Sequence, residues 1–222
     1  MEKQSAIELL RRTWILMRRN SRAVWLSLGV LSIVLAFFGR GVISFAALVY
    51  AQYELSYSAL ASADMLESGY RGRRFFAVGA LLLLNYVIIG IGLALFVIPG
   101  IFLAARLVAS VPALIAEETG IFEAMVISWR RTRSNTISVC LAFAALLAVA
   151  VAAFMGTAMI AGVTSVAAGM RSEPNMLAMF AFGVMVLAVM TAMVIAYWHL
   201  AVAVYAGSRT EGTDAHLEEV FA

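Results

Sequence analysis

The chain has 222 residues, of which 64% are hydrophobic and 13% charged, and its formal net charge is +3. Soluble domains are closer to roughly 45–50% apolar and about 25% charged, so the composition excludes an ordinary soluble fold. The single cysteine, Cys140, excludes a disulfide framework and a cysteine-rich metal site.

Six apolar segments are long enough, or nearly so, to cross a bilayer, which takes roughly 20 residues. The sequence therefore predicts an all-α fold, a polytopic membrane helical bundle of six transmembrane helices in one integral membrane domain over residues 1–222. The predicted spans cover about 23–39, 41–63, 75–98, 101–116, 136–168 and 176–206, followed by a cytoplasmic tail at 208–222. The second span is the least apolar because it contains Gln52 and Glu54.

Basic residues alternate in number from one connection to the next. Thirteen lie before the first span, in the second and fourth connections or after the last span, and only Arg40 and Arg171 lie on the opposite side. The positive-inside rule therefore predicts that both termini are cytoplasmic. The first apolar run has no small-residue cleavage site after it, so we expect it to be retained as a span.

Two basic amphipathic segments, residues 5–20 and 120–134, each lead into a span. At an offset of 115 residues the matching pairs are Glu8 with Glu123, Trp14 with Trp129, Arg18 with Arg133 and Asn20 with Asn135. We expect both segments to form interfacial helices on the inner leaflet. The expected lipid-interface residues are Trp14, Arg18, Trp129, Arg130, Arg131 and Arg133.

The similarity of these segments predicts a parallel internal repeat, in which one interfacial helix and two spans occur twice. The third and fourth spans would then be an inserted hairpin that turns at the helix-breaking pair Pro99 and Gly100, with a further break at Pro112. Chance similarity between two basic amphipathic helices is the alternative.

Four polar side chains fall deep in the predicted spans: Glu54, Asn85, Arg106 and His199. Each is roughly 12–16 Å along its helix from the cytoplasmic end, near the middle of the bilayer. A charge at this depth is costly, so we expect Arg106 to pair with Glu54 or His199. This intramembrane polar layer fits either a proton or solute relay or an ion pair that fixes helix register.

The stretch from Ile98 to Asn135, from the end of the third predicted span to the start of the fifth, carries a recognisable pattern. It comprises Ile98-Pro99-Gly100, Leu103-Ala104-Ala105-Arg106, Pro112, Glu117, Gly120, Glu123-Ala124, Ser128-Trp129 and Arg133. This pattern resembles that of the bacterial six-span proteins named after the membrane domain of glycerophosphoryl diester phosphodiesterases, a superfamily that includes YciC-like proteins. The resemblance implies a helical protein of the bacterial cytoplasmic (inner) membrane and a family with no established activity. Some relatives also carry a soluble phosphodiesterase barrel, for which this sequence has no matching segment.

The sequence contains none of the common catalytic or nucleotide-binding motifs. We therefore expect no enzymatic activity, no cofactor and no metal, and a membrane scaffold or accessory module that engages lipid or a partner protein. Every basic cluster borders a span, which favours anionic lipid headgroups of the inner leaflet over nucleic acid as the partner. The alternative is a small transporter or permease that uses the polar layer around Arg106.

Overall fold

The computed structural model is almost entirely helical. The structure describes residues 5–39, 41–66, 74–167 and 176–221, and within these ranges it contains nine α-helices and no strand, which confirms the predicted all-α class. In chain order they are α1 (Ala6–Arg19), α2 (Ser21–Phe38), α3 (Val42–Ser62), α4 (Phe75–Leu95), α5 (Val97–Leu107), α6 (Ser110–Ala116), α7 (Ile121–Arg131), α8 (Thr136–Ala167) and α9 (Met176–Phe221).

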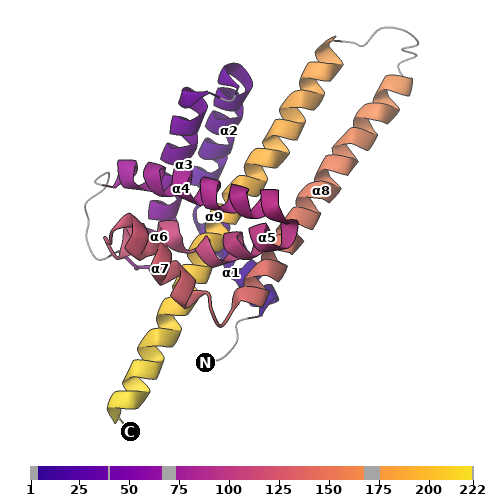
Figure 1. Ribbon diagram of the computed structural model, residues 1–222. Coiled ribbons are helices and arrows are strands. Elements are labelled where there is room, and N and C mark those ends of the chain that lie inside the picture. The colour runs from indigo at the N-terminus through magenta and orange to yellow at the C-terminus, as the bar shows by residue number, and fades with distance from the viewer. Residues whose placement is uncertain (1–4, 40, 67–73, 168–175, 222) are drawn as a thin grey trace.

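Four long helices set the main direction of the molecule (Figure 1). The helices α2 and α3 form one antiparallel pair and α8 and α9 form another, with α9 packed against both α2 and α3. The α2–α3 turn and the facing ends of α8 and α9 lie at one end of the molecule. The start of α1 and the end of α9 both lie at the opposite end of the molecule. This arrangement is compatible with both termini being on the same side of a membrane.

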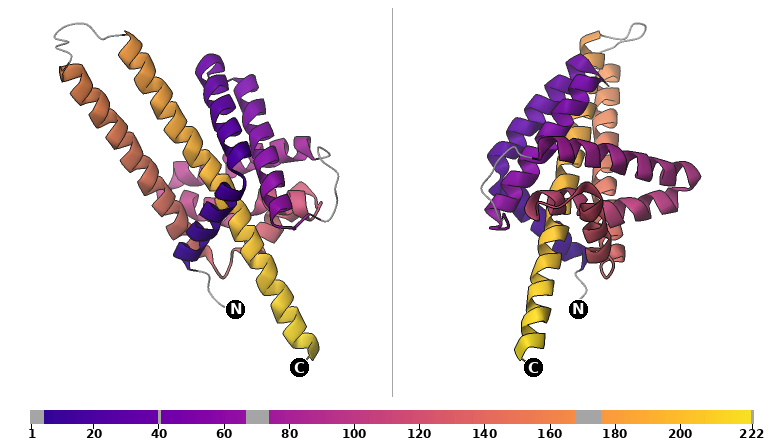
Figure 2. Two further views of the ribbon diagram at one scale, coloured as in Figure 1. Left: turned by 180° about the vertical axis from the view of Figure 1, so that it is seen from behind. Right: turned by 60° about the vertical axis from the view of Figure 1, so that its left-hand side comes forward.

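The hairpin of α4 and α5 runs across these long helices and not alongside them (Figure 2). It projects sideways from the bundle, and α6 and α7 lie near its base. The sequence predicts upright third and fourth spans at these positions. Helices that cross so steeply cannot all follow the membrane normal, so the observed hairpin departs from that expectation.

The turn of this hairpin lies at Phe96 and not at the predicted Pro99-Gly100 pair. Phe96 has extended backbone with φ −159°, and α5 begins directly after it. Pro99 therefore falls in the first turn of α5, where its missing N–H removes no helical hydrogen bond. Gly100 lies where α5 contacts α4, and an added Cβ would be only 2.8 Å from the backbone nitrogen of Leu93. The glycine allows the backbones of α4 and α5 to approach closely.

Among the residues that the structure describes, five segments are long and apolar enough to cross a membrane: Ser21–Phe38, Phe75–Leu95, Ile98–Ala116, Thr136–Ile160 and Phe180–Ser208. Helix α3 does not reach this hydropathy, although it has 21 residues. Its polar residues include Gln52 and Ser56, and both are buried inside the bundle. The low hydropathy of α3 therefore reflects polar groups that face other helices and not exposure to water.

Helices α1 and α7 occupy equivalent places before α2 and α8. The helices begin 115 residues apart, at Ala6 and Ile121, and α2 and α8 begin at the same offset. Both bury the corresponding positions Leu9 and Ala124 completely. The next buried pair is Thr13, 3% exposed, and Ser128, 0% exposed. An internal duplication would produce these matching helix starts and buried positions. The internal repeat itself stays a prediction.

We expect Gly100→Ala to destabilise the protein, since the new Cβ must displace both the Leu93 side chain and the α4 backbone. Overpacking of this kind costs about 1–3 kcal/mol. Gly90→Ala is the matched control, because no atom lies within 4 Å of a Cβ built there. Thermal unfolding of both variants in detergent, followed by tryptophan fluorescence, checks this. A midpoint for Gly100→Ala equal to that of Gly90→Ala would contradict the close contact.

Candidate functional site

Arg106 lies in the last turn of α5, and its guanidinium extends to the C-terminal part of α7. The Nη1 group donates a hydrogen bond of 3.1 Å to the main-chain carbonyl of Trp129. The guanidinium carbon is also 4.9 Å from the centre of the Trp129 ring and 5.1 Å from that of Phe102. A cation is favoured both at a helix C-terminus and over aromatic faces, so this side chain holds α5 against α7.

The main-chain carbonyl of Arg106 is bound from α7 as well. It accepts a hydrogen bond of 2.8 Å from Ser128 Oγ. It is also 3.2 Å from Thr132 Oγ1, a hydroxyl that lies 2.8 Å from the Ser128 carbonyl as well and can donate its single proton to either acceptor. The neighbouring Leu107 carbonyl accepts one from Ser110 Oγ at 2.6 Å. The last carbonyls of a helix have no partner within that helix, and α5 ends here. We call Arg106, Ser128, Trp129 and Thr132 the α5–α7 clamp.

A second group of contacts fixes α6, α7 and α9 together. Glu117, directly after α6, forms an ion pair of 2.5 Å with Arg131 of α7, and both side chains are largely buried. The same carboxylate oxygen accepts a hydrogen bond of 2.9 Å from the hydroxyl of Tyr205 on α9. The Arg131 guanidinium carbon lies 4.9 Å from the Tyr205 ring centre. We call these three residues the anchor cluster.

A third contact ties the base of the hairpin to the α6–α7 connection. Arg74, which caps the start of α4, donates hydrogen bonds to the main-chain carbonyls of Glu118 and Thr119. Glu118 has a positive φ of 52°, so the chain turns sharply at this point. The crosswise hairpin is therefore held at its base through α5, α6 and the residue before α4.

The four residues of the predicted polar layer do not gather at one place. The expected contact of Arg106 with Glu54 or His199 is wrong, because the clamp contacts given above take the guanidinium to α7. Asn85 donates a hydrogen bond of 2.9 Å to Ser110 Oγ. His199 is buried, and its Nδ1 is 2.8 Å from the carbonyl of Ile195 on its own helix. Glu54 is half-buried on α3.

The predicted lipid-interface residues fall into two groups. Five of them are exposed on α1, on α7 or in the α7–α8 connection: Trp14, Arg18, Trp129, Arg130 and Arg133. The sixth, Arg131, belongs to the anchor cluster, and its side chain is 24% exposed. The sequence did not predict the roles of Thr132 and Tyr205. Tyr205 is 88 residues from Glu117 along the chain, and no local pattern connects the two.

Two hollows border this region. The first is an open groove of about 560 Å³ between α5 and α8, with Arg106, Arg133 and Thr136 on its lining. Its other lining residues are Ile101, Phe102, Ile137, Cys140, Leu141 and Ala144. The second is a cavity of about 260 Å³ among α3, α4, α5, α6, α8 and α9. In the ranges that the structure describes, no three His, Cys, Asp or Glu side chains come close enough to hold a metal.

Comparison with known families gives a match over residues 76–216 to the membrane domain of glycerophosphoryl diester phosphodiesterase. The chain belongs to this family. The resemblance inferred from the Ile98–Asn135 stretch is therefore confirmed, and the matched range includes the whole clamp and the whole anchor cluster. Comparison with curated proteins gives no match, and neither does comparison with solved structures.

We expect Ser128→Ala and Thr132→Val to act non-additively. In each single variant the remaining hydroxyl can still donate a hydrogen bond to the Arg106 carbonyl, so the loss of stability is small. The double variant leaves this buried acceptor unpaired, which costs about 1–3 kcal/mol of folding stability. The measurement is the midpoint of thermal unfolding in a double-mutant cycle. Ser134→Ala, at an exposed position nearby, is the control. Strictly additive losses would show that the two hydroxyls do not share this carbonyl.

Proposed function

We propose that the chain is a non-catalytic membrane module whose inner-leaflet surface binds anionic phospholipid. The observation that carries this proposal is the groove between α5 and α8. Its lining combines two arginines with mainly apolar side chains, and this combination fits a phosphate next to an acyl chain.

The charge at the groove is not neutralised within the described part of the protein. Neither Arg106 nor Arg133 forms an ion pair with a described carboxylate, whereas Arg131 nearby is paired with Glu117. The groove also includes Thr136, the first residue of the long helix α8, where the helix dipole favours an anion. These features make the groove positively charged while most of its lining is apolar.

Helices α1 and α7 support a position at the membrane interface. Each packs through one face and leaves large apolar side chains exposed, with Ile7 79% and Trp14 63% exposed on α1. The corresponding residues of α7, Phe122 and Trp129, are 75% and 42% exposed. Exposed apolar groups next to arginines are typical of helices that lie at the headgroup level.

For the topology we propose four upright spans, α2, α3, α8 and α9, with the α4–α5 hairpin entering the membrane from the cytoplasmic side and returning to it. This arrangement keeps the same thirteen basic residues on the inner side as six upright spans would. It also keeps the two units α1–α2–α3 and α7–α8–α9 in one orientation, as a parallel repeat requires. The protein would lie in a bacterial inner membrane.

The transporter alternative has less support. It needs polar side chains that line one route through the bundle, and the predicted layer is instead divided. The polar side chain of Arg106 is turned to α7, Asn85 contacts Ser110, and His199 binds its own helix. A scaffold role fits these contacts better, because each one fixes the position of a helix.

We expect Arg133→Gln to reduce binding of phosphatidylglycerol roughly fivefold, since a well-placed basic residue contributes about 1 kcal/mol to anionic lipid binding. Arg130→Gln is the matched control, because Arg130 is exposed on the adjacent helix turn and does not line the groove. Native mass spectrometry of protein titrated with phosphatidylglycerol or phosphatidylcholine measures this. A specific site would be refuted if the two variants lost the same amount of phosphatidylglycerol binding. It would also be refuted if the wild-type protein retained phosphatidylglycerol and phosphatidylcholine equally well.

We expect a cysteine at Leu95, near the hairpin turn, to resist an impermeant thiol reagent applied to either side of the membrane. The background is Cys140→Ala. Gly41→Cys, in the α2–α3 turn, is the control for outside accessibility, and Ser208→Cys is the control that reacts only after permeabilisation. Reaction of Leu95→Cys in intact cells would mean that the hairpin reaches the outer surface and that α4 and α5 are full spans.

A further inference from the structure

The cavity enclosed by the helices is separate from the lipid groove and has different chemistry. Its volume is about 260 Å³, slightly below the range of small-molecule sites. The fifteen residues that line it include no Arg, Lys, Asp or Glu. Tyr86 lines the cavity and is 53% exposed, so the cavity is open to the surface of the protein at α4.

Two amide side chains in the cavity have unused acceptors. Gln52 is 4% exposed and Asn85 is 8% exposed. Gln52 Oε1 and Asn85 Oδ1 have no hydrogen-bond partner in the described part of the protein, although Asn85 Nδ2 binds Ser110. An unpaired buried acceptor costs about 1–3 kcal/mol, so these two oxygens favour a ligand that brings O–H donors.

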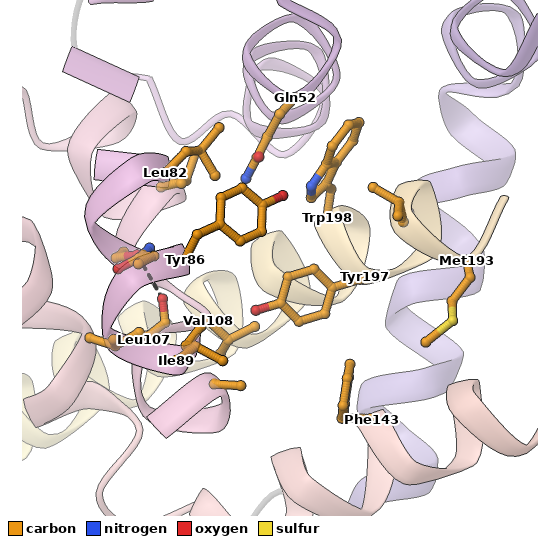
Figure 3. A pocket seen from close by; sticks show the side chains of 15 residues that line it. Gln52, Leu82, Tyr86, Ile89, Leu107, Val108, Phe143, Met193, Tyr197 and Trp198 are labelled. Carbon is orange, nitrogen blue, oxygen red and sulfur yellow. Dashed lines mark hydrogen bonds between the residues drawn. The ribbon is translucent and has the colours of Figure 1, made fainter. Parts of the chain in front are cut away.

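Hydrogen-bond donors approach the same space from other helices (Figure 3). The hydroxyl of Tyr86 and the indole nitrogen of Trp198 lie on the Gln52 side of the cavity, whereas the hydroxyl of Tyr197 points toward Val108. Apart from Asn85 and Ser110, the rest of the lining is apolar and includes Leu82, Ile89 and Phe143. The site therefore offers acceptors and donors close together within a hydrocarbon-like wall.

We propose that this cavity binds an uncharged lipid that has free hydroxyl groups and an ester carbonyl next to an acyl chain, the chemistry of an acylglycerol. The hydroxyls donate to Gln52 Oε1 and Asn85 Oδ1, and the carbonyl accepts from the tyrosine or tryptophan donors. The acyl chain leaves past Tyr86 into the bilayer. A phosphate does not fit, because burying an anion without a cationic partner is very costly.

The test uses 1-monooleoylglycerol as probe, with the full-length protein in phosphatidylcholine nanodiscs and native mass spectrometry as the readout. Methyl oleate has the same chain and ester but no hydroxyl, and oleoyl lysophosphatidate has the same chain and a phosphate. Gln52→Met removes the acceptor with little change of shape. Ser44→Ala is the matched control, because Ser44 is also buried on α3 with an unpartnered oxygen but does not line the cavity.

We expect 1-monooleoylglycerol to bind more strongly than methyl oleate, and Gln52→Met to weaken its binding roughly three- to tenfold, as loss of one hydrogen bond does. Ser44→Ala should have no effect. The Gln52→Met protein should fold, because the change removes an unpaired buried polar group. The second readout is the midpoint of thermal unfolding. We expect 1-monooleoylglycerol to raise it in the wild type and to raise it less in Gln52→Met.

Equal binding of 1-monooleoylglycerol and methyl oleate, or no difference between Gln52→Met and Ser44→Ala, would overturn the proposal and leave water as the cavity's occupant. Preference for oleoyl lysophosphatidate would also overturn it. If that preference disappears in Arg133→Gln, the lipid is held in the α5–α8 groove instead. The two proposals fail independently, since Arg133 does not line the cavity and Gln52 does not line the groove.

Discussion

A chain that ends one helix and starts another inside or beside a membrane must supply hydrogen-bond partners for the backbone groups at the break. This protein meets that requirement between α5 and α6 with side-chain hydroxyls. Ser128 and Thr132 bind the carbonyl of Arg106, and Ser110 binds that of Leu107. Ser128 lies on α7 and Thr132 is the residue that caps its C-terminus, so both donors are in place only when α7 packs against the end of α5. The direction of the crosswise hairpin therefore depends on a helix that comes later in the chain.

Two arginines of the same region have opposite roles, and their surroundings explain the difference. Arg131 is largely buried, and the Glu117 carboxylate and the Tyr205 ring compensate its charge. Arg106 has a carbonyl and two aromatic rings as partners, which stabilise a cation without neutralising it. Its positive charge therefore acts at the surface of the groove, together with that of Arg133. The two arginines therefore differ in whether a carboxylate neutralises their charge.

The sequence predicted the helices well because apolar length and basic flanks are local properties. It placed α1, α2, α3, α7 and α8 within a few residues of their observed bounds, and it placed the start of α9 correctly, but it ended the last span at 206, whereas α9 continues to Phe221. It failed for the hairpin, because a Pro-Gly pair is compatible both with a turn and with a helix start at a close contact. It also failed for the partner of Arg106, since spacing along a helix gives depth but not rotation about the axis. Tyr205 could not be predicted, because its contact with Glu117 depends on how α9 crosses the bundle.

Helix α9 has 46 residues and no interruption. At about 1.5 Å per residue it is roughly 70 Å long, more than twice the thickness of a hydrocarbon core of about 30 Å. The anchor cluster holds it at Tyr205, where it passes α6 and α7. Beyond that residue the helix continues away from the other helices (Figure 1). A continuous helix resists bending, so force or rotation applied near Phe221 is transmitted to the hydrogen bond at Tyr205 and from there to the base of the hairpin. The end of α9 is thus mechanically connected to the part of the protein that contains both hollows.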